Sequence, residues 1–302
     1  MKRYTCVLFL SLLGMPLVGA QEIKSPSIAE LQATADQGDA AAQYQLASAH
    51  LRGEGVPKDR QKAFELMKAA ADQGHADAMG GLGYCYSAGV SVPKDQKQAL
   101  EWFRKGAEKG SAKAQLNLGK LLLKGQGDTA ADPESQRKEG LQWIQKAADQ
   151  NMPDAASTYG SILYFGDHGI EKNYDLAAKY LKIAAEAGLA NAQNILGCLY
   201  DFGLGVPSDA SLAQQWFRKA ALQGNVKAQS NLGRVLGPSS EVKEARIEAL
   251  AWLLIASDQD EITAKKLLQN ELPGLKSGDM ESANKLAADL RKQIQPKTSR
   301  PN

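Results

Sequence analysis

A glycine-rich segment in front of a helix is the first feature of this sequence that could do chemistry. Residues 52–60 read RGEGVPKDR, and a phosphate-binding loop likewise sets glycines before a helix whose first N–H groups hold the anion. Here, however, Pro57 has no N–H to offer, and Asp59 places a negative charge where the anion would lie. The segment therefore does not predict a nucleotide site.

Side chains suited to catalysis or metal binding are few and scattered. The chain has 3 histidines, His50, His75 and His168, which stand far apart and without an HxxH or CxxC motif. No serine lies in a nucleophile-elbow context. We therefore expect no enzyme active site, no metal site and no bound cofactor.

The same glycine-rich segment is well explained as a joint between two helices. Gly53 supplies the left-handed residue that follows a helix, and Pro57 comes after the stop because it cannot continue one. Asp59 is an N-cap residue, whose side chain accepts hydrogen bonds from the first N–H groups of the next helix. Gly74 then ends that helix. The segment therefore predicts a helix–turn–helix unit.

This unit recurs along the chain. The helix-ending position returns at intervals of 36, 36, 41, 37 and 36 residues, as Gly38, Gly74, Gly110, Asn151, Gly188 and Gly224. The joints of the third and fourth units have different sequences, but each still ends in a residue suited to begin a helix. These residues are Asp132, which is followed by Pro133, and Asn173. A fixed period in this range predicts a solenoid of stacked helix pairs.

Two columns of residues indicate how the helix pairs pack. A large side chain precedes each helix end after the first by 8 residues: Leu66, Trp102, Trp143, Tyr180 and Trp216. A second column is small: Ala47, Gly83, Gly119, Gly160, Gly197 and Gly233. Small residues let helices approach closely, so we expect the large column to fill the core between repeats.

The motifs A-x(4)-L-G, Y-x(2)-G-x-G-V-P-x-D and A-x(2)-W-x(2)-K-A-A-x(2)-G resemble the Sel1-like repeat, a relative of the tetratricopeptide repeat. The resemblance covers residues 39 to about 256, in six units. It implies an all-α, right-handed superhelical solenoid of about six helix–turn–helix repeats with terminal capping helices. The expected domains are a signal peptide at 1–20, an N-terminal capping helix at 27–38, the repeat solenoid at 39–257, C-terminal capping helices at 258–294 and a disordered tail at 295–302.

Residues 1–20 have the pattern of a secretory signal. Lys2 and Arg3 precede the apolar run CVLFLSLLGMPLVGA, which is shorter than the ~20 residues that span a bilayer and ends in small residues. Cleavage after Ala20 would leave 34 basic residues against 34 acidic ones, so the charge predicts no nucleic-acid binding. We expect a periplasmic protein with no stable membrane insertion after cleavage.

The two cysteines beyond the signal are predicted not to pair. Cys85 and Cys198 fall on first helices three repeats apart. Helices that pack at roughly 8–10 Å place them too far from each other for a disulfide. Cys198 stays open as a site of intermolecular pairing.

The resemblance also implies where a partner protein binds. In tetratricopeptide pairs the first helix of each repeat lines the concave face of the solenoid. On that register the expected partner-binding residues are Tyr44, Tyr84, Lys120, Tyr164, Asn194, Asp201 and Arg234. Tyrosine and arginine are frequent anchors in protein interfaces.

Several roles remain open on this resemblance. We expect a periplasmic protein–protein interaction scaffold, and one version is an immunity protein that neutralises a type VI secretion effector. The alternatives are regulation of an envelope sensor kinase and support of polysaccharide machinery. Cysteine-rich relatives suggest β-lactam binding or hydrolysis, but this sequence lacks a cysteine pair in each repeat.

Overall fold

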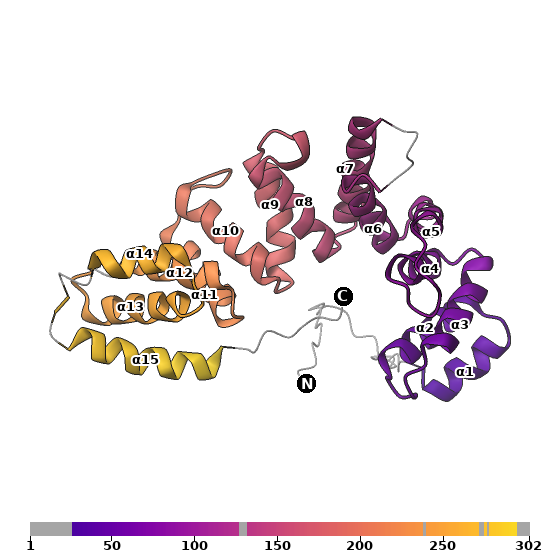
Figure 1. Cartoon of the computed structure of the whole chain (residues 1–302), viewed down its shortest axis with the longest axis horizontal. Coiled ribbons are helices and arrows are strands. Elements are labelled where there is room, and N and C mark those ends of the chain that lie inside the picture. Colours follow the sequence, from indigo (N-terminus) through magenta and orange to yellow (C-terminus); the bar gives the residue numbers. More distant parts are fainter. Residues whose placement is uncertain (1–25, 127–131, 238–239, 272–274, 277, 295–302) are drawn as a thin grey trace, which may run out of the picture.

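The computed structural model describes residues 26–126, 132–237, 240–271, 275–276 and 278–294. The expected signal peptide at 1–20 and the expected tail at 295–302 lie outside these residues. All the regular structure of the described residues is helical, and the helices follow one another in pairs. Figure 1 shows the pairs stacked in a curved array that runs from α1 at one end to α15 at the other.

Each repeat contributes a first and a second helix. The first helices are α2 (Ala40–Arg52), α4 (Ala76–Ala88), α6 (Ala112–Leu123), α8 (Pro153–Phe165), α10 (Ala190–Phe202) and α12 (Val226–Leu236). The second helices are α3 (Arg60–Asp72), α5 (Gln96–Glu108), α7 (Pro133–Asp149), α9 (Tyr174–Glu186), α11 (Ala210–Leu222) and α13 (Lys243–Ser257). The remaining helices are α1 (Ile28–Asp36), the 3-10 turn η1 (Asp167–Gly169), α14 (Ile262–Glu271) and α15 (Asp279–Gln293).

The helix boundaries follow from the capping residues that the sequence predicts. Asp59 begins α3 by accepting a hydrogen bond from the Lys62 backbone N–H at 2.9 Å. Gly53 follows α2 with φ of 72°, in the left-handed region. Asn151 ends its repeat with φ of 58°, so an asparagine replaces glycine at a left-handed position, which this residue type tolerates. The predicted joints are confirmed.

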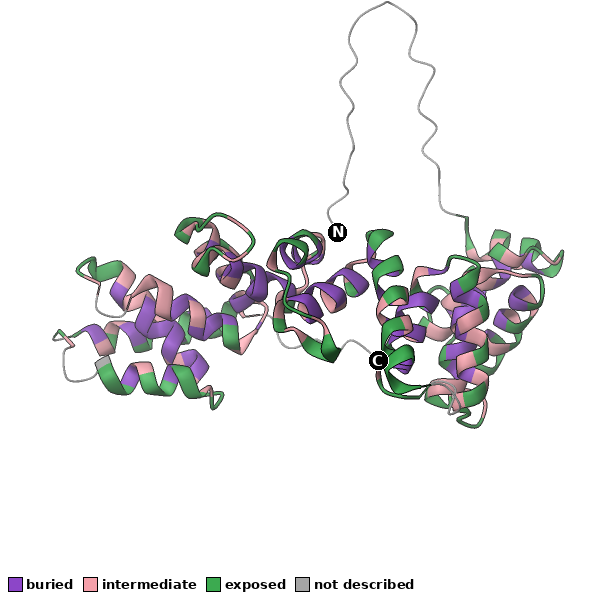
Figure 2. Cartoon of the chain, turned by 90° about the horizontal axis from the view of Figure 1, so that it is seen from above, coloured by how far each residue is buried: buried purple, intermediate pink, exposed green. Residues whose placement is uncertain are grey.

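The first helices lie on the inner side of the curved stack. Each first helix packs against the second helix of its own repeat, and α4 also contacts α6, α8 contacts α10 and α12 contacts α14. Helices on the concave side of a bent solenoid lie closest together, so these contacts place the first helices there. Figure 2 shows the buried residues between the helices and the exposed residues around them.

The large core column lies one residue later than the sequence predicted. Phe103 and Phe217 are buried, and a Cβ atom added to Gly83 or Gly197 would lie 2.5 or 2.7 Å from their rings. The small column is therefore the seat of these rings. The residues that occupy the buried column are Met67, Phe103, Ile144, Leu181 and Phe217.

The predicted column has a different environment. Leu66, Trp102, Trp143 and Trp216 are half-buried, and only Tyr180 of that set is buried. The ammonium of Lys105 lies 4.5 Å from the centre of the Trp102 ring, and those of Lys146 and Lys219 lie 4.2 Å from Trp143 and Trp216. An indole carries a polar N–H and suits a rim position, so the tryptophans cover the core without filling it.

Helices α13, α14 and α15 close the C-terminal end of the stack. Trp252 on α13 is fully buried, and Arg246 donates from Nε to Asp279 Oδ2 of α15 at 2.6 Å. Both side chains of this ion pair are buried, so α15 is tied to the last repeat by a charged contact as well as by apolar packing. Within the described ranges, no helix combines the length and the apolar character needed to cross a bilayer.

Candidate binding surface

Three neighbouring first helices are joined by polar side chains on one face. Asn231 of α12 donates from Nδ2 to Asn194 Oδ1 of α10 at 3.0 Å, and the same nitrogen lies 3.6 Å from Cys198 Sγ. Tyr164 of α8 lies close enough to Cys198 for each side chain to shift the pKa of the other. The contacts connect repeats four, five and six across the inner side of the stack.

An ion pair extends this network along α10 and α12. Arg234 pairs with Asp201, and its guanidinium carbon lies 5.5 Å from the centre of the Phe202 ring. The Asp201 side chain is 16% exposed and that of Arg234 is 34% exposed, so both charges are partly shielded from water. A planar guanidinium held at once by a carboxylate and a ring has a fixed orientation.

Burial makes the thiol and the phenol of this network poor acids. Burial, with the neighbouring Asp201 carboxylate, raises the pKa of Cys198 to about 11. Burial, together with Cys198 and Tyr174, raises the pKa of Tyr164 to about 12. Both groups are therefore protonated at neutral pH, and a protonated Cys198 thiol is a weak nucleophile for intermolecular pairing. Cys198 and the buried Cys85 are both free, as predicted for this pair.

The other predicted partner-binding residues lie on the first helices of repeats one to three. Tyr44 of α2 stacks on His75, with ring centres 4.9 Å apart. Tyr84 of α4 is 37% exposed. Burial lowers the pKa of the Lys120 ammonium on α6, against the opposing effect of the Asp154 carboxylate. The structure thus brings together Tyr164, Asn194, Asp201 and Arg234, and it places Tyr44, Tyr84 and Lys120 on three successive helices before them.

The repeat pattern places the chain among known proteins. A model of the Sel1 repeat matches residues 40–75, 76–111, 112–152, 153–189, 190–225 and 226–261, which is most of the chain. The chain belongs to the Sel1 repeat family. No curated protein matches it in sequence.

Solved structures agree with this assignment. A protective antigen of uropathogenic Escherichia coli strains, which displays an SLR fold, is 28% identical with a TM-score of 0.72 over 88% of this chain. The chain spans 56% of the length of that antigen. A Sel1 repeat protein from Oxalobacter formigenes is 29% identical with a TM-score of 0.59, over 76% of this chain and 89% of its own. An immunity protein from Pseudomonas aeruginosa is 25% identical over 74% of this chain and 84% of its own, but its TM-score of 0.42 carries no functional argument.

Three side chains of this Sel1 surface were not predicted from the sequence. Asn231 connects the predicted Asn194 with Cys198, and Phe165 and Phe202 are exposed large apolar residues at the ends of α8 and α10. A signal for the phenylalanines exists in the repeat register. Each one is the last residue of its helix, directly before a left-handed glycine, and the corresponding residues of earlier Sel1 repeats are Arg52, Ala88 and Lys124.

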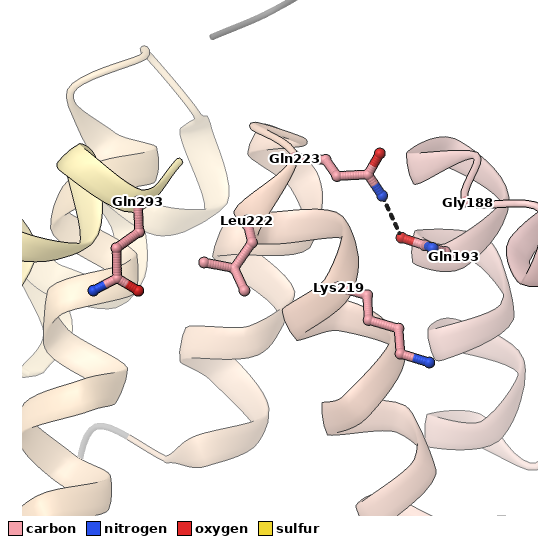
Figure 3. Close-up of a pocket in the computed structure, with 6 residues that line it drawn as sticks. All are labelled: Gly188, Gln193, Lys219, Leu222, Gln223 and Gln293. Atoms are coloured by element: carbon pink, nitrogen blue, oxygen red, sulfur yellow. Dashed lines mark hydrogen bonds between the residues drawn. The ribbon is translucent and has the colours of Figure 1, made fainter. Parts of the chain in front are cut away.

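A pocket lies between the ends of α10, α11 and α15. Figure 3 shows its lining, which comes from α10, α11, α15 and the turn before α10: Gly188, Gln193, Lys219, Leu222, Gln223 and Gln293. This lining contains no acid–base pair and no thiol or hydroxyl nucleophile. In the part of the chain that the structure describes, no group of histidine, cysteine and acidic residues is arranged to hold a metal ion.

Proposed function

We propose that this Sel1 repeat protein is a scaffold that binds a partner protein on the inner face of its first helices. The observation that carries the proposal is the network in which Asn231 and Arg234 connect α12 with α10, with Tyr164 of α8 close beside Cys198. A network of this kind holds polar and aromatic side chains in one arrangement before a partner arrives. Binding then costs less conformational entropy than it would on a flexible surface.

The residue types of the network suit protein recognition. Arginine and tyrosine are enriched among the residues that contribute most to binding energy. Arg234 remains partly exposed to solvent. Tyr84 adds an exposed ring at the same repeat position as Arg234, on the first helix of repeat two. No bound small molecule or metal is needed for this function.

Export to the periplasm is part of the proposal. It rests on residues 1–20, whose charged start and short apolar run have the pattern of a cleavable signal. The test is mass spectrometry of the protein purified from a periplasmic extract. A mature chain that begins at Gln21 supports the proposal, whereas the intact chain or a lipid-modified product contradicts it.

The finer role that we propose is that of an immunity protein for a secreted toxin. What supports this version is the family resemblance of the repeats, together with a binding face that requires no catalytic group. Co-expression tests it directly: a toxic effector sent to the periplasm should kill cells that lack this protein and spare cells that make it. Survival that does not depend on the protein would leave only the general scaffold role.

A site-specific photo-cross-linker tests the scaffold itself. Ser161 of α8 is half-buried and occupies the register position of Lys120, so a cross-linking residue there faces the proposed partner. Gln142 of α7 is exposed on a second helix and gives the matched control. We expect one partner band from position 161 and none from position 142. A band from position 142 alone would show that the opposite face binds.

A further inference from the structure

The end of α8, the start of α9 and the end of α10 carry four aromatic side chains, which we call the aromatic patch: the exposed Phe165 and Phe202 and the half-buried Tyr164 and Tyr174. Phe165 is 52% exposed and Phe202 is 60% exposed, so neither ring contributes much to the core. The two phenylalanines occupy the same position in successive repeats, as the last residue of the first helix. Contiguous exposed apolar surface is a feature of interaction sites.

The rings of the patch are held in place by their neighbours. The Phe165 ring meets Tyr164 edge to face with ring centres 4.9 Å apart, and Tyr164 in turn meets Tyr174 at 5.8 Å. The guanidinium of Arg234 lies 5.5 Å from the centre of the Phe202 ring. Because its rings already have fixed neighbours, the patch loses little side-chain freedom when it is covered.

Acidic side chains lie on one side of the patch, in the segment that follows α8. Asp167, Glu171 and Asp175 lie in the joint between Phe165 and α9 and at the start of α9, and all three are exposed. None of these three forms an ion pair within the described ranges, and Lys172 is the lysine of the same joint. The joint of repeat two, residues 88–97, instead carries Lys94 and Lys97 against Asp95. The turn edge of the solenoid is therefore acidic beside the aromatic patch and basic near its N-terminal end.

We infer that the aromatic patch binds a segment of the partner protein that presents apolar side chains flanked by lysine or arginine. The inference rests on the proposed scaffold function and specifies the chemistry of its partner. Apolar side chains of the segment cover Phe165 and Phe202, and its cations face the carboxylates of the neighbouring joint. Complementary charge of this kind raises the rate of association and selects the partner. The rings, which become buried when the partner binds, supply most of the affinity.

A pair of designed peptides tests this chemistry without knowledge of the natural partner. One peptide of about 12 residues, roughly three helical turns, carries leucine on one face and lysine elsewhere, and the second replaces each lysine by glutamate. Binding of labelled peptide to the full-length protein is followed by fluorescence anisotropy at two salt concentrations. We expect the lysine peptide to bind about tenfold more tightly than the glutamate peptide, with the difference reduced by salt.

Variants locate the binding site. The double variant Phe165→Ala with Phe202→Ala should bind the lysine peptide about tenfold more weakly, or worse. Its helical spectrum should stay unchanged, because both rings are exposed. The double variant Asp167→Asn with Glu171→Gln should lose less affinity for the lysine peptide. Its affinity should also depend much less on salt concentration than that of wild type. Val242→Ala with Ile262→Ala removes equally exposed apolar side chains elsewhere and should change nothing.

The outcomes separate this inference from the scaffold function. Unchanged peptide binding by the phenylalanine variant, or tighter binding of the glutamate peptide, overturns the inference. The inference also fails if wild type forms a dimer that the phenylalanine variant abolishes, since a second copy of the chain then covers the patch. It fails as well if the patch binds lipid vesicles. The cross-link from position 161 is measured separately, so the scaffold function can stand while the inference fails.

Discussion

Gln223 at the end of α11 donates from Nε2 to Gln193 Oε1 on α10 at 2.8 Å, and Gln193 donates to the Ala185 carbonyl at 3.0 Å. Gln193 is 4% exposed. Its amide thus joins the end of α9 to the beginning of α10 and the end of α11. A buried polar side chain needs partners for its donors and its acceptor, and this geometry supplies both.

The same arrangement recurs where the sequence allows it. Four repeats have glutamine at both positions: Gln43 with Gln73, Gln115 with Gln150, Gln193 with Gln223, and Gln229 with Gln259. The other two repeats have glutamine at neither position, with Met79 and Lys109 in one and Ala156 and Ala187 in the other. The two glutamines are therefore kept or replaced together within this chain.

This joint replacement leads to a prediction about repeat five. Gln193→Met should destabilise the protein by about 1–3 kcal/mol, because the Ala185 carbonyl loses a donor and Gln223 loses its acceptor. Gln223→Lys added to it should cost little more, because the pair then has the residue types of repeat two. Urea denaturation of both single variants and the double variant measures the coupling between the two sites. Strictly additive effects would contradict a shared hydrogen-bond unit.

The position of the core column gives a second prediction. Phe217→Ala should cost about 3–5 kcal/mol, because the ring is fully buried against Gly197. Trp216→Ala should cost less, about 1–2 kcal/mol, because the indole is only half-buried and contacts the Lys219 ammonium at the edge of the core. Denaturant unfolding of the two variants, compared with wild type, ranks the two side chains. Equal losses, or a larger loss for Trp216, would restore the tryptophan column as the core.

The local parts of this fold were predictable from the sequence. A helix end depends on a few neighbouring atoms, so cap residues such as Asp59 and Gly53 can be recognised from residue type and local sequence. The repeat period then follows from the spacing of these residues. The choice between Trp216 and Phe217 as the core residue was not predictable in the same way. Two adjacent aromatic residues on a helix differ by about 100° in direction, and only the packing of the neighbouring helix decides which one is buried.

The candidate surface was predicted only in part for the same reason. The structure brings together four of the residues chosen by this register, Tyr164, Asn194, Asp201 and Arg234, but it buries Asn194 at 8% exposure. The roles of Asn231 and Phe202 depend on the offset between successive helices, which no single repeat encodes. Whether any of these residues contacts a partner remains a prediction.

The buried ion pair at the C-terminal end gives a pH-dependent prediction. The hydrogen bond from Arg246 lowers the pKa of the Asp279 carboxyl in the folded protein. A carboxyl whose pKa is lower in the folded than in the unfolded chain stabilises the fold above its unfolded pKa of about 4, and this contribution disappears as the pH falls through the folded-state value. Asp279→Asn should therefore melt at a lower temperature than wild type at pH 7, and the gap should narrow as the pH falls below about 4.

A control for this measurement lies on the protein surface. Asp260 pairs with Lys265 at 2.6 Å, but its side chain is 90% exposed. Asp260→Asn should leave the melting temperature almost unchanged at both pH values, because water screens an exposed pair. A constant gap between wild type and Asp279→Asn across the pH range would show that the substitution acts through packing and not through the charge.

The last prediction separates the structural role of the Asp201–Arg234 pair from its role in binding. Asp201→Arg or Arg234→Asp alone puts like charges together on α10 and α12, which should cost about 1–2 kcal/mol for a partly buried pair. The double variant exchanges the two charges, so the ion pair and most of the stability should return. The guanidinium no longer stands over Phe202, however, and the polarity presented to a partner is reversed. We therefore expect thermal unfolding near that of wild type, together with a cross-link from position 161 that stays weak. Full recovery of the cross-link in the double variant would show that the ion pair stabilises the fold alone. Binding of the partner would then not depend on which of the two positions carries the positive charge.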